Sequence, residues 1–332
     1  MYRLLRPLLF RLDPETAHHL TLRLLRFTGG FAPARRLVSA LYASPPDPVE
    51  AFGLTFRNPV GLAAGYDKDA VAWRGLAALG FGHIELGTVT PLPQPGNEPP
   101  RVFRLIEDEA LINRLGFPGS GAAEVIYRLR NRPPTGCILG VNIGKNKGTP
   151  LELAARDYVN LMRDFSRLAD YVTVNVSSPN TAGLRRLQAR DALENLLGEL
   201  ARARRKETRI PILVKLAPDL DDTALDDAVG AVLSAGMDGI VVTNTTVSRP
   251  ELISTHAGET GGLSGKPLGT LSQAILEKII ARVDGAVPVV AAGGIMGPED
   301  ARRRLDAGAA LVQVYTGLVY RGPGLVREIL KK

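Results

Sequence analysis

Eight short apolar runs of strand type recur along the chain from residue 50 onward, and each ends in glycine or polar residues. The runs are residues 59–65, 83–90, 137–144, 171–178, 211–218, 239–245, 288–294 and 311–317. Segments with helical periodicity fill most of the gaps, for example residues 69–80 and 221–236. This alternation predicts an α/β fold, a parallel (β/α)8 TIM barrel whose active site lies at the carboxyl ends of its strands.

The fourth run shows how such a strand ends. Most of residues 171–176 are β-branched or aromatic. The polar residues Asn175, Ser177, Ser178 and Asn180 follow around a proline at the end of the run. Neutral amides and hydroxyls at a strand end suit the binding of a planar polar ligand. The alternative is a plain turn with local side-chain to backbone hydrogen bonds.

Lys215 places one cation inside an otherwise apolar strand. A buried charge is costly unless it is paired, so we expect it to face a bound anion or an electron-rich ring, or else a core carboxylate. The Gly293-Gly294 pair and the Tyr315-Thr316 pair end the last two runs, where barrel enzymes commonly bind phosphate. Glycine turns without a ligand are the alternative.

Composition excludes several function classes. The net charge is +7, but aromatic residues make up only 5% and no nucleic-acid-binding motif is present, so we expect no nucleic acid partner. The single cysteine, Cys137, excludes an intrachain disulfide, and the spacing of the histidines predicts no metal site. The first residues lack a secretory cleavage site, and no apolar run reaches the roughly 18 residues of a membrane span. A cytoplasmic location is therefore expected.

The first 43 residues form a separate, basic segment. They hold seven arginines against two acidic residues, and residues 2–12 and 14–28 read as amphipathic helices. Asp13 is the expected N-cap of the second helix, and Gly29-Gly30 the expected end. Such a pair either lies in a membrane interface or packs on the main domain as a helical hairpin. We predict an arm of residues 1–43, with a linker at 44–48, and a barrel domain of residues 44–332.

Two connections are longer than a barrel requires. Residues 91–136 follow the second strand and contain a proline-rich stretch, and residues 246–265 follow the sixth strand and end in GGLSG. Insertions at the catalytic face of a barrel usually act as lids or substrate loops.

Ordered motifs along the chain resemble those of class 2, quinone-linked dihydroorotate dehydrogenase. They are AAGYDK (63–68), FGHIELGTVTPLPQPGNEPPR (81–101), LINRLGF (111–117), NIGKNK (142–147), NVSSPNTAGLR (175–185), VKLAPDL (214–220), TNTT (243–246), GGLSGKPL (261–268), AAGGI (291–295) and LVQVYTG (311–317). Soluble class 1 relatives place a cysteine at the base position, whereas Cys137 begins the third strand at the wrong end of the barrel. The serine and the arm together indicate class 2.

The resemblance implies oxidation of (S)-dihydroorotate to orotate in de novo pyrimidine (UMP) synthesis, with FMN accepting a hydride and ubiquinone or menaquinone reoxidising it. Ser178 matches the catalytic base. The implied FMN-binding residues are Ala63, Ala64, Gly65, Tyr66, Asp67, Thr88, Asn142, Asn175, Lys215, Thr243, Gly265, Gly294, Tyr315 and Thr316. The implied substrate-binding residues are Lys68, Asn113, Arg114, Leu115, Gly116, Phe117, Asn175, Asn180, Asn244 and Thr245.

His18, Arg104 and Tyr315 match residues of the quinone site, which implies a tunnel under an arm that meets the membrane surface. We therefore expect a monomer bound peripherally to the cytoplasmic face of the cell membrane. Tyr66 stands where Leu or Phe is common in the family, and Pro118 where Asn is usual. Another FMN-dependent TIM-barrel oxidoreductase, or a non-enzymatic membrane-associated metabolite-binding barrel, remains an alternative.

Overall fold

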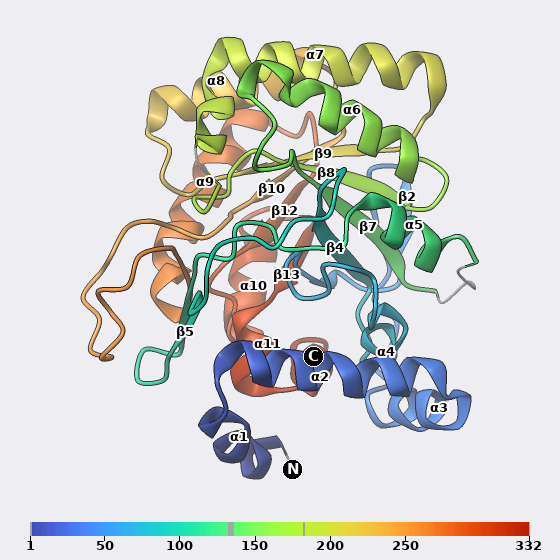
Figure 1. The fold of residues 1–332 in the computed structure, drawn as a ribbon, viewed down its shortest axis with the longest axis vertical. Coiled ribbons are helices and arrows are strands. Elements are labelled where there is room, and N and C mark those ends of the chain that lie inside the picture. The colour runs from blue at the N-terminus through green and yellow to red at the C-terminus, as the bar shows by residue number, and fades with distance from the viewer. Residues whose placement is uncertain (1, 132–135, 182, 332) are drawn as a thin grey trace.

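The computed structural model describes residues 2–131, 136–181 and 183–331 (Figure 1). Several predictions touch residues outside these ranges. Met1 of the arm, Lys332 of the barrel domain, residues 132–135 of the long insertion and Ala182 of the motif 175–185 lie outside the described residues.

Eight parallel strands close into a barrel in the order β10-β12-β13-β3-β4-β7-β8-β9. In chain order they are β3 (Val60–Leu62), β4 (His83–Val89), β7 (Ile138–Ile143), β8 (Tyr171–Asn175), β9 (Ile212–Leu216), β10 (Gly239–Val242), β12 (Val289–Ala292) and β13 (Leu311–Val314). Each strand lies within one of the eight runs found in the sequence. The predicted (β/α)8 barrel is therefore confirmed.

Helices surround this barrel, and Figure 1 shows α6, α7 and α8 side by side along one flank. They are α4 (Trp73–Ala77), α5 (Ala122–Leu129), α6 (Ala154–Phe165), α7 (Arg190–Glu207), α8 (Asp222–Ser234), α9 (Gly269–Val283), α10 (Pro298–Asp306), α11 (Thr316–Arg321) and α12 (Leu325–Ile329). Three short 3₁₀ helices complete the set: η1 (Leu151–Leu153), η2 (Leu184–Gln188) and η3 (Lys266–Leu268).

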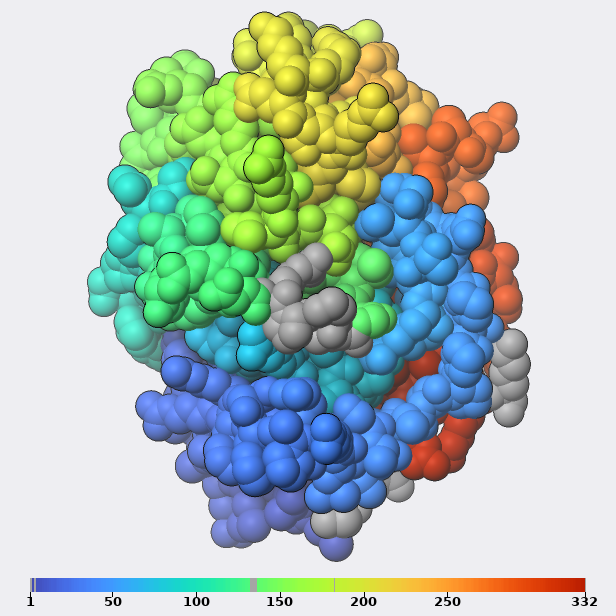
Figure 2. Space-filling view, turned by 90° about the vertical axis from the view of Figure 1, so that its right-hand side faces the viewer, coloured from blue at the N-terminus to red at the C-terminus, as the bar shows by residue number. Residues whose placement is uncertain are grey.

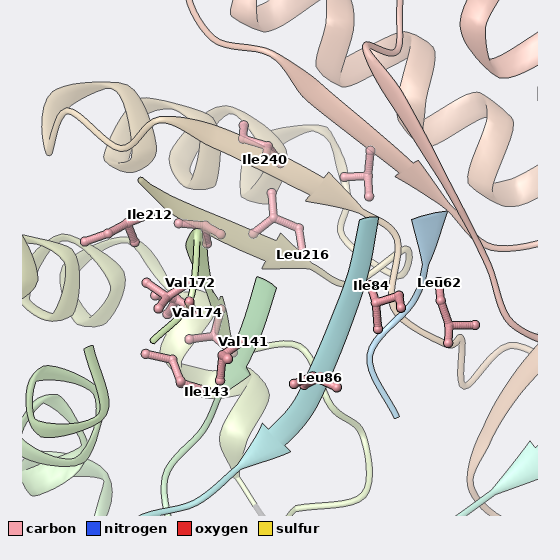
Figure 3. Close-up of a cluster of buried hydrophobic side chains, with 14 of the residues drawn as sticks. Leu62, Ile84, Leu86, Val141, Ile143, Val172, Val174, Ile212, Leu216 and Ile240 are labelled. Carbon is pink, nitrogen blue, oxygen red and sulfur yellow. The ribbon is translucent and has the colours of Figure 1, made fainter. Parts of the chain in front are cut away.

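Alternate residues of each strand point to opposite faces of the barrel wall. One set is apolar and packs in the main core under the helices, as Ile84, Leu86, Val141 and Val174 do in Figure 3. The other set faces the barrel interior. At the amino ends of the strands this interior is apolar, and a hairpin of β1 (Val49–Ala51) and β2 (Leu54–Phe56) packs against it through Phe56. The sequence reasoning did not predict this hairpin.

The two long insertions build one small sheet rather than independent loops. Strands β5 (Val102–Leu105) and β6 (Ala110–Asn113) come from the first insertion, and β11 (Gly262–Gly265) comes from the second. They pair antiparallel in the order β11-β6-β5. The GGLSG segment is therefore a strand as well as a loop, and it holds both insertions in one rigid unit.

The arm consists of three helices, α1 (Tyr2–Arg11), α2 (Pro14–Gly30) and α3 (Ala32–Leu41). Asp13 caps α2 as predicted, because its Oδ1 accepts the backbone N–H groups of Glu15 and Thr16 at 3.0 and 2.9 Å. α2 ends at Gly30, so Gly29-Gly30 closes the helix as predicted, although the helix runs two residues past the expected residue 28. Gly29 is buried where α2 crosses α4, so its missing side chain serves close packing within the helix, and a third helix follows.

The arm packs on the main domain, which confirms one of its two interpretations, and the membrane-interface interpretation stays a prediction. Figure 2 shows it as a blue surface against the lower part of the molecule, and Leu22, Leu25 and Val38 pack on the main core. The opposite face leaves a row of large apolar side chains exposed, namely Leu4, Leu5, Leu8, Leu12, Leu20, Leu24, Phe27, Phe31, Leu37 and Leu41. Over the described residues, no helix combines the length and the apolar character that crossing a bilayer demands.

We predict that Gly75→Ala loosens the arm. A Cβ at this position of α4 would lie 2.1 Å from the carbonyl oxygen of Leu25 in α2, so the two helices must separate. Overpacking of this kind costs about 1–3 kcal/mol, measurable as a lower midpoint of denaturant unfolding. Gly30→Ala is the matched control, because a Cβ there meets nothing within 4 Å. Equal stability of Gly75→Ala and the parent chain would contradict this packing.

Candidate active site

A cavity opens at the carboxyl ends of the barrel strands, and we call it the mouth cavity. It gathers most of the site residues predicted from the sequence. Those that line it are Ala63, Ala64, Gly65, Lys68, Thr88, Asn113, Leu115, Gly116, Phe117, Asn175, Ser178, Asn180, Lys215, Thr243, Asn244, Thr245, Gly265, Gly294, Tyr315 and Thr316. Residues from seven of the eight strand ends and from both insertions therefore meet at one place.

Four residues predicted to bind FMN or substrate do not line the mouth cavity. Asn142 is fully buried below it, and Arg114 forms a 2.7 Å ion pair with Glu259 on the insertion. Tyr66 and Asp67 line a different cavity, described below. The carboxylate of Asp67 accepts the backbone N–H groups of Val71 and Ala72, so it organises the chain that leads into α4. These residues can support the site only from outside the cavity wall.

A chain of amides forms the floor of the mouth cavity. Asn175 Nδ2 donates to Thr88 Oγ1 at 2.9 Å and to Asn142 Oδ1 at 3.0 Å. Asn244 Nδ2 in turn donates to Ser177 Oγ at 2.9 Å. Because each amide is held by its neighbours, the floor presents a fixed pattern of donors and acceptors to a ligand.

Lys215 is the cation predicted to face a ligand. Its side chain is buried, it lines the mouth cavity, and Nζ has no hydrogen-bond partner among the described residues. Burial lowers the pKa of this amine, and the negative charge of Glu85 opposes the shift. A core carboxylate, Glu85, therefore acts on Lys215 through its charge without a hydrogen bond to it. The ammonium group itself stays available to a ligand in the cavity.

Glycine backbones form the opposite end of the mouth cavity. Gly265 and Gly294 have positive φ angles of 96° and 71°, and a Cβ on Gly294 would lie 2.2 Å from the Cα of Gly269. Only glycine leaves the backbone accessible at such a close approach. Open backbone at one end and a free buried cation near the amide floor fit a planar cofactor that carries a phosphate.

Ser178 lies at the cavity wall beside the amide floor. Its Oγ accepts the backbone N–H of Asn180 at 3.3 Å, and Asn180 Nδ2 donates to Asn113 Oδ1 at 3.1 Å. This second bond joins the loop after β8 to strand β6 of the insertion sheet. The serine is therefore enclosed between a barrel strand and the sheet that covers it.

Sequence reasoning missed the residue that ties these loops together. Arg185 Nε donates to the carbonyl of Ser177 at 3.0 Å, and its Nη2 donates to the carbonyl of Thr245 at 2.9 Å. Asp219 holds the same guanidinium at 2.7 Å. An arginine that ends the polar motif 175–185 was the available signal, because a charge so close to a buried strand end needs partners.

A second cavity of about 560 Å³ lies between the arm and the barrel, and we call it the arm cavity. Its lining is mostly apolar, and it includes His18, Arg104 and Tyr315, which the resemblance assigns to a quinone site. Both cavities share part of their lining, namely Lys68, Asn113, Leu115, Ser264 and Tyr315. A thin wall of side chains thus separates the two sites.

Aromatic rings pack edge-on at this wall. The ring of Tyr66 lies edge-on to His18 at 5.0 Å and to Tyr315 at 5.7 Å between centroids. Arg104 closes another side of the arm cavity, because its guanidinium lies 4.4 Å from the ring of Phe10 and donates to that residue's carbonyl at 3.1 Å. The arm cavity therefore depends on contacts that bring α1 and α2 onto the barrel.

The comparisons with known proteins agree with this geometry. The family model described as dihydroorotate dehydrogenase matches residues 48–332. A relative from Roseiflexus sp. (strain RS-1), named dihydroorotate dehydrogenase (quinone), is 52% identical over 99% of this chain and 92% of its own length. A relative of the same name from Methylococcus capsulatus (strain Bath) is 49% identical over 98% and 96%. The chain belongs to the dihydroorotate dehydrogenase family.

Solved structures of this family have the same fold. The crystal structure of DHODH from Eimeria tenella in complex with ferulenol superposes with a TM-score of 0.85 and 40% identity, covering 96% of this chain and 90% of that one. Its ligand-free counterpart gives a TM-score of 0.84, covering 96% and 93%. The names of the two curated relatives confirm the resemblance to the quinone-linked class of dihydroorotate dehydrogenase.

Three titratable groups at the wall have shifted pKa values, and burial is the main cause of each shift. The pKa of His18 falls to about 3, and nearby Lys68 adds to the effect. The pKa of Lys68 itself falls to about 8, so this amine still carries its charge at neutral pH. The pKa of Asp67 rises to about 6 despite its two backbone hydrogen bonds. At neutral pH, these pKa values favour a neutral His18 beside a cationic Lys68 at the wall.

We predict that acid weakens the folded chain through His18. Its pKa is about 3 when folded and near 6.5 when unfolded, so the unfolded state binds more protons between these values. Stability present above pH 6.5 is lost as the pH falls, by about 2 kcal/mol at pH 5. Asp67 acts in the opposite direction, because its raised pKa favours the folded state in acid.

Denaturant unfolding of the parent and of His18→Gln at pH 7 and pH 5 isolates this contribution. Asp67 is present in both proteins, so its effect cancels in the comparison. The parent should lose more stability than the variant over this interval. Equal losses would mean that His18 is not buried as neutral imidazole.

Proposed function

We propose that this chain oxidises (S)-dihydroorotate to orotate in de novo pyrimidine biosynthesis, with FMN as hydride acceptor and a membrane quinone as terminal acceptor. The observation that carries the proposal is the pair of cavities with a shared wall. One lies at the barrel mouth and carries lysines, amides and hydroxyls, which can hold a polar substrate. The other is mostly apolar and lies under the arm, where a lipid-like quinone can enter.

The chain then divides into two functional parts. Residues 1–43 form the arm that covers the quinone site, and residues 44–332 form the catalytic barrel. The start of the family match at residue 48 supports a boundary close to this point. Side chains from both parts line the arm cavity, so the quinone site needs the arm in its docked position.

FMN fits the mouth cavity, where its ring would supply a two-electron acceptor for a hydride. The amide floor and Lys215 would hold the ring, and the glycine loops would hold the phosphate. We assign this role to Ala63, Ala64, Gly65, Thr88, Asn142, Asn175, Lys215, Thr243, Gly265, Gly294, Tyr315 and Thr316. Tyr66 and Asp67 would support the cofactor from the side of the arm cavity.

Dihydroorotate is an anionic cyclic amide, and the remaining polar groups suit it. Lys68 provides a cation for the carboxylate, and the asparagines provide donors and acceptors for the ring amides. We assign substrate binding to Lys68, Asn113, Leu115, Gly116, Phe117, Asn175, Asn180, Asn244 and Thr245. Arg114 would hold the insertion loop in place through its ion pair with Glu259.

Ser178 is the proposed base, whose oxygen would take a proton from the substrate carbon while its own hydroxyl proton passes onward through hydrogen-bonded hydroxyls or water. A serine is a weak base, so its oxygen needs stabilisation while the proton is taken. The backbone N–H of Asn180 donates to Ser178 Oγ and favours a more anionic oxygen. The buried position also excludes bulk water, which strengthens this interaction.

We assign the arm cavity to ubiquinone or menaquinone, with His18, Arg104 and Tyr315 at its walls. The exposed leucines and phenylalanines of the arm would enter the lipid interface, and the arginines of the arm would meet lipid phosphates. The protein would then be a monomer bound peripherally to the cytoplasmic face of the membrane. Its quinone would diffuse from the bilayer directly into the arm cavity.

We expect Ser178→Ala to slow flavin reduction by dihydroorotate about 10²- to 10⁴-fold, because general-base catalysis contributes that much. FMN content should be unchanged, and anaerobic stopped-flow absorbance measures the rate. Ser177→Ala is the matched control, because this neighbouring serine is buried and does not line the mouth cavity. It should lose much less rate. Flavin reduction at the parent rate in Ser178→Ala would exclude Ser178 as the base.

A paired substitution tests the membrane surface. Leu24→Glu with Phe27→Glu places two charges on the exposed face of α2, and flotation with phospholipid vesicles should show at least about tenfold weaker binding. Val247→Glu with Ile253→Glu is the control, since these exposed apolar residues lie on a barrel loop. Flavin reduction by dihydroorotate should stay normal in both. Unchanged vesicle binding of the α2 variant would refute the assigned surface.

A further inference from the structure

Glu85 is a fully buried carboxylate that the proposed mechanism does not yet use. It lies on β4 at an inward-facing position, below the mouth cavity. Asn142 Nδ2 donates to its Oε1 at 2.8 Å. Three further donors share Oε2, namely Thr173 Oγ1 at 3.0 Å, Gln313 Nε2 at 3.0 Å and Tyr171 OH at 3.3 Å. Four donors from three other strands, β7, β8 and β13, thus converge on one side chain.

An ionised carboxylate can only accept hydrogen bonds, and this fixes the orientation of the amides above it. Asn142 must turn its Nδ2 toward Glu85, so its Oδ1 faces Thr88 and Asn175. Asn175 must then donate through Nδ2, which leaves its Oδ1 to accept from Asn244 at 3.3 Å. One acceptor at the bottom therefore sets the direction of three amides at the cavity floor.

Glu85 also acts on Lys215 without forming an ion pair with it. The two residues stand on β4 and β9, and no ion pair joins them within the described part of the chain. A direct pair would consume the ammonium group, whereas a carboxylate farther away offsets the cost of burying the cation and leaves its donors free. Lys215 lines the mouth cavity, which agrees with an ammonium group that is not paired with Glu85.

We propose that Glu85 is a positioning residue of the flavin site, which orients the amide floor and keeps Lys215 charged with its Nζ free for the cofactor. This inference rests on the proposed function, because it assigns the mouth cavity to FMN. A purely structural role is the alternative, in which the carboxylate only satisfies buried donors. The two differ in whether Glu85 affects FMN through Lys215.

The test measures FMN affinity of the cofactor-free full-length chain by quenching of flavin fluorescence. Glu85→Gln keeps the shape, removes the charge and adds a donor, so the dissociation constant should rise about tenfold or more. Thr173→Val is the matched control, since it removes one donor to Glu85 and leaves the charge. It should change the dissociation constant less than about threefold, even where its loss of stability is similar.

A double-mutant cycle with Lys215→Met separates the two roles. If Glu85 acts through Lys215, Glu85→Gln should weaken FMN binding at least about threefold less when Lys215 is already replaced, and the remaining effect reports the amide floor. An effect of equal size in both backgrounds, or parent affinity in Glu85→Gln, would overturn the proposal. If Glu85→Gln does not fold, Glu85→Met runs the same cycle, because it also removes the charge at a similar side-chain length. A parent chain that binds no FMN would instead refute the proposed function.

Discussion

The alternation of side chains along the barrel strands is the constraint on which the site depends. Each strand must bury one apolar row against the helices, so only every second residue is free to face the barrel interior. On β4 these rows are Ile84 and Leu86 outside, with His83 and Glu85 inside. Polar groups can then collect in the interior without weakening the core, and the closed barrel brings them together from strands far apart in the sequence.

The arm adds a second site without disturbing the first. It packs on the barrel where glycines let α2 and α4 approach closely, and it encloses the arm cavity against the wall of the mouth cavity. Arg101 strengthens this closure through its 2.7 Å ion pair with Glu15 at the start of α2. The two cavities therefore lie close together, and the arm cavity depends on how firmly the arm is docked.

Local signals in the sequence were sufficient for the strands, the strand ends and most residues of the mouth cavity. Local signals were insufficient where an element forms only because it contacts residues distant in the sequence. The hairpin of β1 and β2, the insertion sheet and the continuation of α2 through Gly29 all depend on partners distant in sequence. Glu85 and Arg185 were overlooked for the same reason, because a charge inside an apolar run shows its purpose only when its partners are known. Family resemblance supplied the roles that geometry alone leaves open.

The central claim is that electrons pass from dihydroorotate to FMN in the mouth cavity and then to a quinone in the arm cavity. Double-mixing stopped-flow spectroscopy tests it most directly, with anaerobic dihydroorotate in the first mix and a short-chain quinone in the second. The account predicts bleaching of the flavin absorbance by dihydroorotate, followed by its full recovery with quinone. A flavin that dihydroorotate does not bleach, or that stays bleached with quinone, would contradict it.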